Sequence, residues 1–182
     1  LHNLYGPTEA AVDVLGWTAG SGPVALGTPG WNVTCYVLDD YLHPVPDATA
    51  GELYLGGVQL ADGYLHRHGL TANRFVADPF RPGSRMYRTG DLVRWRHTPA
   101  GAPVLDYLGR TDDQIKLRGI RIEPTDIETT LTTHPTITTT RVIVRNQRLI
   151  AYYLSDAPEP ADADTLRAFA AHLGDSGDVA DL

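Results

Sequence analysis

Glycine and proline divide the first 110 residues into short apolar runs, and this spacing limits that region to short strands. Three such runs are TCYVLDD, GELYLGG and APVLDYLG, beginning at residues 34, 51 and 102, and turn-forming segments such as GTPG, HPVPD and RPG flank them. Apolar runs of this length bounded by glycine or proline are typical of strands, whereas a helix needs a longer periodic run. We therefore expect a β-rich region shaped as a small barrel or sandwich.

The pattern changes after Gly109. Residues 113–122, DQIKLRGIRI, alternate apolar and basic side chains as a strand does, and Gly119 interrupts the alternation as a bend would. Residues 123–135 predict a helix, because Pro124 suits the first helical position and acidic residues follow it near the positive end of the helix dipole.

The last part of the chain predicts a strand pair and a second helix. TRVIVRNQRLIAYYL, residues 140–154, reads as two strands around a tight turn, and ADTLRAFAAHLG, residues 163–174, reads as an amphipathic helix that ends at Gly174. We expect a compact α+β unit over residues 115–174, followed by a polar, loose tail at residues 175–182.

Charge and cysteine content exclude several classes of protein. The net charge of −7 argues against a nucleic-acid surface, which needs a basic face. The single cysteine, Cys35, excludes an internal disulfide and favours the reducing cytoplasm. No apolar run approaches the roughly 18 residues of a membrane-spanning helix, and the first residues lack the basic start of a signal peptide. We expect a cytoplasmic protein with neither a nucleic-acid nor a membrane partner.

The segment YGPTE, residues 5–9, combines groups that could hold a nucleotide and a metal ion. Its Gly-Pro turn can expose backbone N–H groups, and the Thr8 hydroxyl beside them can donate to an anion. The Glu9 carboxylate is a hard oxygen ligand of the kind that Mg²⁺ accepts while it also holds substrate phosphates. Tyr5 offers an aromatic face for a nucleobase. A string this short is by itself more often only a turn, so a nucleotide site requires matching motifs elsewhere in the chain.

Three further motifs come after YGPTE in order: GELYLGGVQLADGYL at 51–65, MYRTGDLVRW at 86–95 and YLGRTDDQIKLRGIRIEPTDIE at 107–128. Together the four motifs resemble the adenylation domains of nonribosomal peptide synthetases, members of the adenylate-forming superfamily that also contains acyl-CoA synthetases and luciferases. The resemblance runs from residue 2 to about residue 170, nearly the whole chain.

The resemblance implies an α/β multidomain adenylate-forming fold. Residues 1–110 would form the β-barrel-like end of the large subdomain, residues 111–114 the hinge, and residues 115–174 the start of the small α+β subdomain. Residues 175–182 would be a tail or the boundary to a following or inserted domain.

The resemblance also implies roles in binding ATP and Mg²⁺ for matching residues of YGPTE. Tyr5 and Gly6 would belong to the nucleotide site, with Tyr5 stacked on adenine. Thr8 would contact the phosphates, and Glu9 would hold Mg²⁺.

Further nucleotide contacts are implied at three residues of the later motifs. Asp91 would accept hydrogen bonds from the ribose hydroxyls, as a carboxylate can from two adjacent hydroxyls. Tyr107 would line the pocket, and Arg110 would reach ribose and phosphate. Without the neighbouring motifs, Asp91 would read as a turn residue and Arg110 as a surface charge.

Two residues beyond Arg110 match positions involved in the family's change of conformation. Asp112 resembles the hinge about which the small subdomain swings after the acyl-adenylate forms, and a hinge needs only a few positions that absorb a change in φ and ψ. Lys116 resembles a residue that meets the nucleotide site in the thioester-forming state. From composition alone these two residues would be a solvated turn and an exposed strand lysine.

Three residues match the family's amino-acid pocket: Leu4, Val12 and Asp13. This combination resembles serine-activating domains. The carboxylate of Asp13 could accept a hydrogen bond from a hydroxyl side chain, and a site built to bind a hydroxyl rejects analogues that lack it. Threonine or another small polar amino acid stays open.

Two implied partners concern the middle of the chain and the next domain. The segment LTANRFVADPF, residues 70–80, is typical of domains that bind an MbtH-like helper protein, and Ala77 would insert between aromatic residues of that partner. Plain packing explains the segment equally well. A peptidyl carrier domain would present its phosphopantetheine thiol. We expect His66 and His68 to flank Arg67 in a loop.

Several family motifs are absent from the 182 residues: the Gly-rich phosphate loop, the aspartate that grips the substrate amino group, and the catalytic lysine. Little adenylation is therefore expected from this chain alone, because charge stabilisation is the main catalytic contribution. Either the chain is one stretch of a longer polypeptide that supplies the remaining parts of the domain, or a methyltransferase interrupts the domain after Leu182.

The expected reaction is ATP-dependent formation of an aminoacyl-AMP, with serine as the expected amino acid, followed by transfer to the carrier thiol. Two alternatives remain open: an acyl-CoA ligase of the same superfamily, and a non-catalytic docking module that keeps only the fold.

Overall fold

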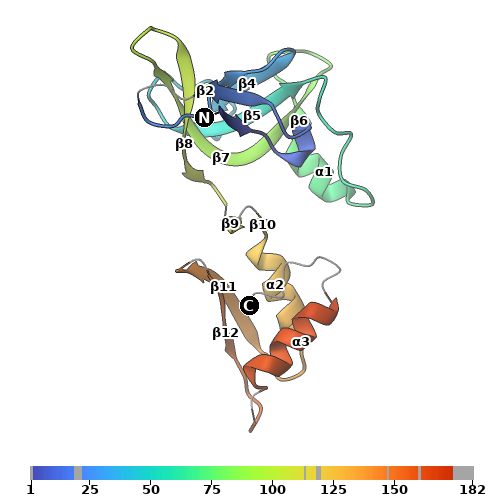
Figure 1. The fold of residues 1–182 in the computed structure, drawn as a ribbon. Coiled ribbons are helices and arrows are strands. Elements are labelled where there is room, and N and C mark those ends of the chain that lie inside the picture. The colour runs from blue at the N-terminus through green and yellow to red at the C-terminus, as the bar shows by residue number, and fades with distance from the viewer. Residues whose placement is uncertain are drawn as a thin grey trace. The chain divides into compact units, whose positions relative to one another are not determined.

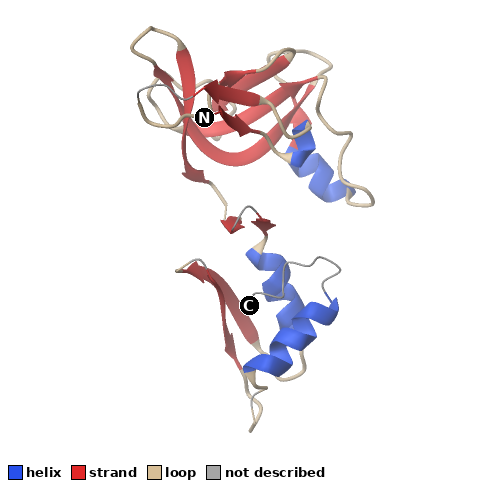
Figure 2. Ribbon diagram, viewed as in Figure 1, coloured by secondary structure: helices blue, strands red, loops and turns tan. Residues whose placement is uncertain are grey.

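A computed structural model of the chain describes residues 2–18, 22–112, 114–117, 120–146, 148–159 and 161–173. The chain divides into two compact units, Leu1–Thr111 (unit 1) and Asp112–Leu182 (unit 2), and each is described on its own (Figures 1 and 2). None of the helices in the described ranges is long and apolar enough to cross a membrane.

Unit 1 is built mostly of antiparallel strands. They are β1 (His2–Tyr5), β2 (Leu15–Thr18), β3 (Thr28–Pro29), β4 (Val33–Leu38), β5 (Gly51–Gly57), β6 (Phe75–Ala77), β7 (Arg85–His97) and β8 (Pro103–Arg110). The three apolar runs bounded by glycine or proline thus form β4, β5 and β8, as their pattern predicts. A short 3-10 helix, η1 (Thr8–Ala10), follows β1.

The strands form two sheets that share one core. Strands β1, β2 and β3 make one sheet, and β4, β5, β7 and β6 make the other, in that order, with β8 also paired to β7. A bridge between Gly27 and Leu105 joins the two sheets. One buried cluster contains residues from both: Tyr5, Ala10, Val14, Leu15, Leu26, Val37, Leu53, Leu55, Val93 and Leu105. The shared core fixes β1 and η1 against β5 and β7.

Strand β7 organises the larger sheet, because it pairs with three other strands. Its first residues pair with β6, its last residues with β8, and its middle with β5. A helix that the sequence did not predict, α1 (His68–Arg74), leads into β6 (Figure 1). The loop expected around Arg67 is therefore wrong at His68, which begins this helix, while His66 lies before it with φ 57°.

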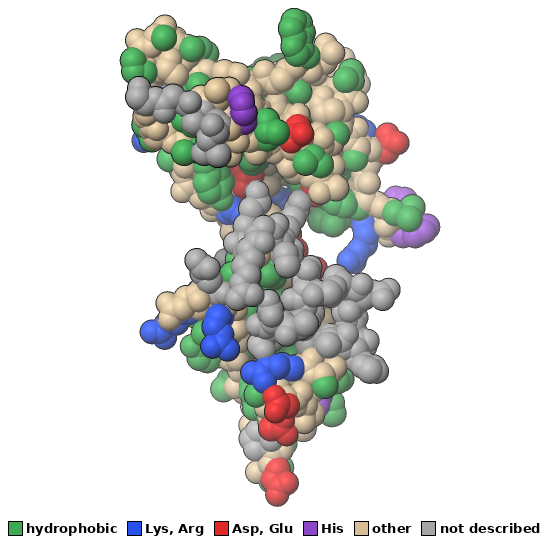
Figure 3. All heavy atoms as spheres, in the orientation of Figure 1, with side chains coloured by type: hydrophobic (Ala, Val, Ile, Leu, Met, Phe, Trp, Pro, Cys, Tyr) green, Lys and Arg blue, Asp and Glu red, His purple; other side chains and the backbone are tan. Residues whose placement is uncertain are grey.

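Several large apolar side chains of unit 1 lie at its surface, and Figure 3 shows such side chains on the face drawn there. Four are more than four-fifths exposed: Trp31, Tyr41, Val58 and Leu65.

Unit 2 is the small α+β unit that the sequence pattern predicts. Its elements are β9 (Ile115–Leu117), β10 (Ile120–Ile122), α2 (Pro124–Thr132), β11 (Thr139–Arg145), β12 (Arg148–Leu154) and α3 (Ala163–Leu173). Pro124 lies at the start of α2, as expected. Strands β9 and β10 form one antiparallel pair, and β11 and β12 form another. The bend expected at Gly119 and the helix end expected at Gly174 lie outside the described residues.

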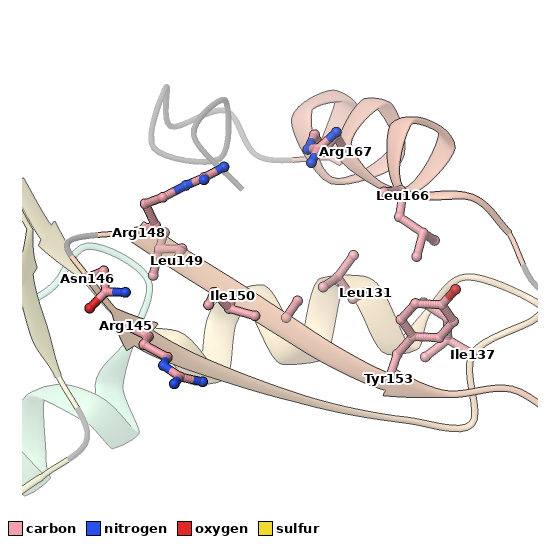
Figure 4. A pocket seen from close by; sticks show the side chains of 12 residues that line it. Leu131, Ile137, Arg145, Asn146, Arg148, Leu149, Ile150, Tyr153, Leu166 and Arg167 are labelled. Atoms are coloured by element: carbon pink, nitrogen blue, oxygen red, sulfur yellow. The ribbon is translucent and has the colours of Figure 1, made fainter.

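A hydrophobic core joins the helices of unit 2 to its hairpin. It includes Ile127 and Leu131 from α2, Val142 from β11, Leu149 from β12 and Leu166 from α3. Beside this core lies a groove of about 400 Å³ between α3 and β12. Figure 4 shows the apolar side chains inside the groove and arginines near its edges.

Candidate nucleotide site

The YGPTE segment folds into a tight turn because its glycine allows the chain to fold back on itself. A side chain at Gly6 would lie 2.0 Å from the Val12 backbone oxygen, so only glycine fits there. The Val12 N–H donates to the Pro7 carbonyl oxygen, and the Val14 N–H donates to the Tyr5 carbonyl oxygen. These bonds place Tyr5 at the end of β1 and Glu9 in η1, with both side chains buried.

A β-bulge in β7 takes Asp91 out of the ladder with β5, while Asp91 still pairs with Arg110 of β8. Glu52 pairs with Leu92 and Tyr54 pairs with Arg88, so three residues of β7 lie opposite Leu53 alone. The middle residue of these three, Gly90, has φ 77°, a left-handed conformation that favours glycine. The TGD motif at residues 89–91 is therefore a bulge within a continuous strand rather than a turn.

Asp91 is held from two sides by residues that are distant in sequence. The Tyr5 hydroxyl donates to Asp91 Oδ2. Arg110 Nη1 donates to Asp91 Oδ1 over 2.7 Å, and Arg110 Nη2 donates to the Thr89 carbonyl oxygen over 3.1 Å. The side chains of Arg110 and Asp91 are only 10% and 6% exposed. Three residues that the sequence assigns to a nucleotide site thus meet in one buried cluster.

Glu9 lies in a second cluster that also reaches β7. The Tyr64 hydroxyl donates to Glu9 Oε1 over 2.6 Å and lies 3.5 Å from the Tyr87 hydroxyl. Phe75 contacts the rings of both tyrosines. Tyr87 and Asp91 both belong to β7, so this strand contributes one residue to each cluster.

Burial changes the titration of the tyrosines in both clusters. Desolvation, with the neighbouring Asp91 charge, raises the pKa of Tyr5 far above its usual range. Desolvation and the hydrogen bond to Glu9 raise the pKa of Tyr64 in the same direction. Both hydroxyls therefore keep their protons and act as donors to the carboxylates.

The other residues assigned to the site from the sequence are more exposed. Thr8 and Asp13 are exposed, Leu4 and Val12 are 62% and 58% exposed, and Tyr107 is 49% exposed. Val12 has φ 73°, a strained conformation for a β-branched residue. These surfaces are open to a ligand or to further protein.

Asp112 and Lys116 lie in unit 2, whose position relative to unit 1 is not described. The Gln114 N–H donates to Asp112 Oδ1 over 3.3 Å. The side chain of Lys116 lies outside the described part of the structure. The hinge and thioester-state roles stay predictions.

Sequence reasoning missed four residues that support the site: Glu52, Tyr64, Arg88 and Tyr87. Glu52 accepts a hydrogen bond from the Gly90 N–H over 3.0 Å and forms an ion pair with Arg88. A signal was present in the sequence, because Glu52 is an acidic residue in the otherwise apolar run GELYLGG.

The residues around Glu9 can be compared with the surroundings that Mg²⁺ prefers in proteins. Mg²⁺ is usually bound through one or two carboxylates together with substrate phosphates rather than by a full protein cage. Among the described residues no group of three or more His, Cys, Asp or Glu could hold a metal ion. A single oriented carboxylate next to a tyrosine donor fits an ion whose remaining ligands come from a nucleotide.

Comparison with known proteins gives one family model and many relatives. The family model described as "AMP-binding enzyme" matches residues 1–65. Enterobactin synthase component F of Escherichia coli (strain K12) is 47% identical over 188 residues, covering 92% of this chain and 14% of the relative. The phosphinothricin tripeptide synthetase PhsB of Streptomyces viridochromogenes is 52% identical over 160 residues, covering 84% and 13%. The chain thus spans about one seventh of the length of these curated relatives.

Solved structures share the fold. IdnL1 has a TM-score of 0.80 at 25% identity, covering 99% of this chain and 37% of the other. PA1221, described as an NRPS protein containing adenylation and PCP domains, has a TM-score of 0.72 at 28% identity, covering 91% and 34%.

Proposed function

This chain is related to the adenylation domains of nonribosomal peptide synthetases, within the adenylate-forming superfamily, and we propose that it is the C-terminal part of such a domain. The domain would join an amino acid to AMP and then pass it to a carrier thiol. Several relatives that support this are synthetases, and two of the similar solved structures are described as combining adenylation and PCP domains.

In the first step a carboxylate oxygen of the amino acid attacks the α-phosphorus of ATP, and pyrophosphate leaves. In the second step the thiol of a phosphopantetheine group attacks the aminoacyl carbonyl, and AMP leaves. The proposed role of this chain is to bind and orient the nucleotide. The phosphate loop and the catalytic lysine would come from the remaining parts of the domain.

The observation that carries the proposal is the buried cluster at Asp91. Its carboxylate is fixed by Arg110 and by the Tyr5 hydroxyl, and its proposed role is to accept hydrogen bonds from the ribose hydroxyls. Because Tyr5 donates to Asp91, ribose binding would exchange or share that hydrogen bond. The Tyr5 ring is largely buried, so stacking on adenine would require the base to reach a buried face of this ring. The ring of Tyr107 is more exposed and would be easier for the base to reach.

Glu9 is the proposed ligand of Mg²⁺, and Thr8 the proposed phosphate contact. When bound, the ion would neutralise charge on the phosphates during the transfer. The Tyr64 hydroxyl would orient the Glu9 carboxylate, as outer partners of metal ligands do.

Serine is the proposed amino acid, on the basis of Leu4, Val12 and Asp13. The exposed Asp13 carboxylate follows the left-handed residues Ala11 and Val12, so the turn presents it away from the core. A hydroxyl of the substrate could donate to this carboxylate. Replacing Asp13 with alanine should reduce the preference for serine over alanine.

An MbtH-like helper is a further proposed partner. Ala77 is exposed at the end of β6, which pairs with β7 at the edge of the larger sheet. An exposed small residue on an edge strand would allow aromatic side chains to approach closely. An inserted methyltransferase stays a prediction that the flanking sequence would test.

The proposal is tested by pyrophosphate exchange with the full-length protein. Exchange that depends on serine, and falls at least tenfold in Asp91→Ala, is the expected result. Exchange or CoA-ester formation with fatty acids instead of amino acids would identify an acyl-CoA ligase. Absence of ATP binding to the purified full-length protein would contradict the proposal and favour a docking module.

A further inference from the structure

We infer that Glu52 is a positioning residue for the nucleotide site, because its carboxylate anchors the bulge that carries Asp91. This inference rests on the proposed function of Asp91 in binding ribose. Glu52 itself is only 8% exposed at its side chain and does not touch Asp91 in any contact of the described structure.

The backbone polar groups of the bulge cannot all pair with β5, because three residues of β7 lie opposite Leu53 alone. The Gly90 carbonyl oxygen accepts from the Thr111 N–H over 2.8 Å, and the Asp91 N–H donates to Thr89 Oγ1 over 2.9 Å. The Thr89 hydroxyl donates in turn to the Leu53 carbonyl oxygen. The Gly90 N–H donates to a side chain, Glu52 Oε1, over 3.0 Å.

A buried backbone N–H without a partner is costly, so the bulge depends on an acceptor at this place. Glu52 supplies it from the adjacent strand. Because Gly90 directly precedes Asp91, moving the Gly90 backbone would move the Asp91 carboxylate relative to Tyr5 and Arg110.

A second contact fixes the Glu52 side chain itself. Arg88 Nε donates to both carboxylate oxygens over 3.0 Å, and Arg88 Nη2 lies 2.9 Å from Oε2. The hydrogen bond to Glu52 raises the pKa of Arg88. The guanidinium thus compensates the charge of a largely buried carboxylate while Oε1 still accepts from Gly90.

The test compares ATP with 3′-deoxyATP in pyrophosphate exchange by the full-length protein. The measured quantity is the ratio of KM for 3′-deoxyATP to KM for ATP, which reports contact with the ribose hydroxyl. Asp91→Ala should bring this ratio close to one. Glu52→Ala should lower it at least threefold, and Glu52→Gln should keep most of it, because the amide oxygen can still accept from Gly90.

A matched control removes another carboxylate–arginine pair of the same sheet. Asp106 accepts from Arg96 Nε over 2.8 Å and does not contact the bulge in the described structure. Asp106→Ala should leave the KM ratio unchanged. If Glu52→Ala weakens binding of both nucleotides equally, with an unchanged ratio, its role is only structural and the inference is wrong.

A second measurement does not depend on nucleotide. Amide hydrogen exchange at Gly90 in the ligand-free protein should be at least tenfold faster in Glu52→Ala than in wild type and in Asp106→Ala. An unchanged rate would show that Glu52 does not anchor the bulge. A further outcome is possible, in which amide hydrogen exchange at Gly90 accelerates in Glu52→Ala but Asp91→Ala leaves the KM ratio unchanged. In that case Glu52 does anchor the bulge, but Asp91 does not bind ribose, and the positioning role of Glu52 is wrong as well.

Discussion

Arg110 and Asp91 are paired twice, once through the backbone and once through their side chains. They are register partners in strands β7 and β8, and Arg110 Nη1 lies 2.7 Å from Asp91 Oδ1. The ladder therefore sets the distance between the two backbones, and the Arg110 side chain is then held by its hydrogen bonds to Asp91 and to the Thr89 carbonyl oxygen.

The first prediction concerns this ion pair. Arg110→Ala leaves a buried carboxylate without its cation and should destabilise unit 1 by about 3–5 kcal/mol. Arg110→Lys keeps the charge but cannot reach both Asp91 and the Thr89 carbonyl oxygen as the guanidinium does, so its effect should be smaller. Thermal unfolding of the full-length protein measures both. Equal melting temperatures for wild type and Arg110→Ala would contradict the burial argument.

The second prediction separates backbone strain from site geometry. Gly90 and Gly83 have nearly equal φ values, 77° and 81°, so alanine at either position should cost about 1–2 kcal/mol of stability. Gly83 lies in a turn with nothing within 4 Å of an added Cβ. Only Gly90→Ala should also raise KM for ATP, because it would displace Asp91 from the ribose. The expected increase is about tenfold, which corresponds to weakening one charge-assisted hydrogen bond by ~1.4 kcal/mol. Equal KM values for the two variants would show that the bulge does not set the site.

The third prediction concerns alkaline pH. Burial raises the pKa of Tyr5 in the folded state, whereas an unfolded tyrosine ionises near its ordinary value of 10.0. Unfolding above pH 10 therefore releases a proton, and this contribution to stability is present below pH 10 and is lost as pH rises. Wild type should lose about 1.4 kcal/mol more per pH unit above pH 10 than Tyr5→Phe does.

Denaturant unfolding of both proteins between pH 9 and pH 11.5 measures this difference. Tyr41→Phe, at an 82% exposed position, is the matched control for removing a hydroxyl. Parallel curves for wild type and Tyr5→Phe would mean that Tyr5 is not buried as the structure describes.

The fourth prediction concerns Mg²⁺. Tyr64→Phe removes the donor that orients Glu9. It should raise the Mg²⁺ concentration needed for half-maximal pyrophosphate exchange by about tenfold, because loss of an outer partner of a metal ligand weakens metal binding to this extent. Tyr36→Phe is the control, because Tyr36 donates to Asp78 in a similar tyrosine–carboxylate pair away from Glu9. An identical Mg²⁺ dependence in Tyr64→Phe and Tyr36→Phe would argue against Glu9 as the ligand.

Local sequence pattern was sufficient for most of the fold. The strand β5 is bounded by glycines and the helix α2 starts at a proline, so each carries its own signal. Helix α1 has no such sequence signal, because its N-cap residue, Arg67, makes no side-chain cap and no residue of the helix is buried. Seven residues without an apolar face cannot be distinguished from a loop by periodicity.

Only some residues of the candidate site were predictable from the sequence, and their contacts were not. The motifs identified Tyr5, Asp91 and Arg110, yet the hydrogen bond between Tyr5 and Asp91 joins positions 86 residues apart. Such a pair depends on how two sheets share a core, which no local pattern encodes. The bulge at Gly90 was missed for a related reason, since a Gly-Asp pair has the same composition in a turn and in a bulged strand.

Strand β7 has a consequence for how this region could change during evolution. Three neighbouring strands pair with it along its 13 residues, and both carboxylate clusters depend on which of its residues face which partner. A single inserted or deleted residue between Tyr87 and Asp91 would reverse the direction of the following side chains and separate them from their partners. The β7–β8 connection around Gly101 carries no such constraint, so length variation should accumulate there while the strand itself keeps a constant number of residues.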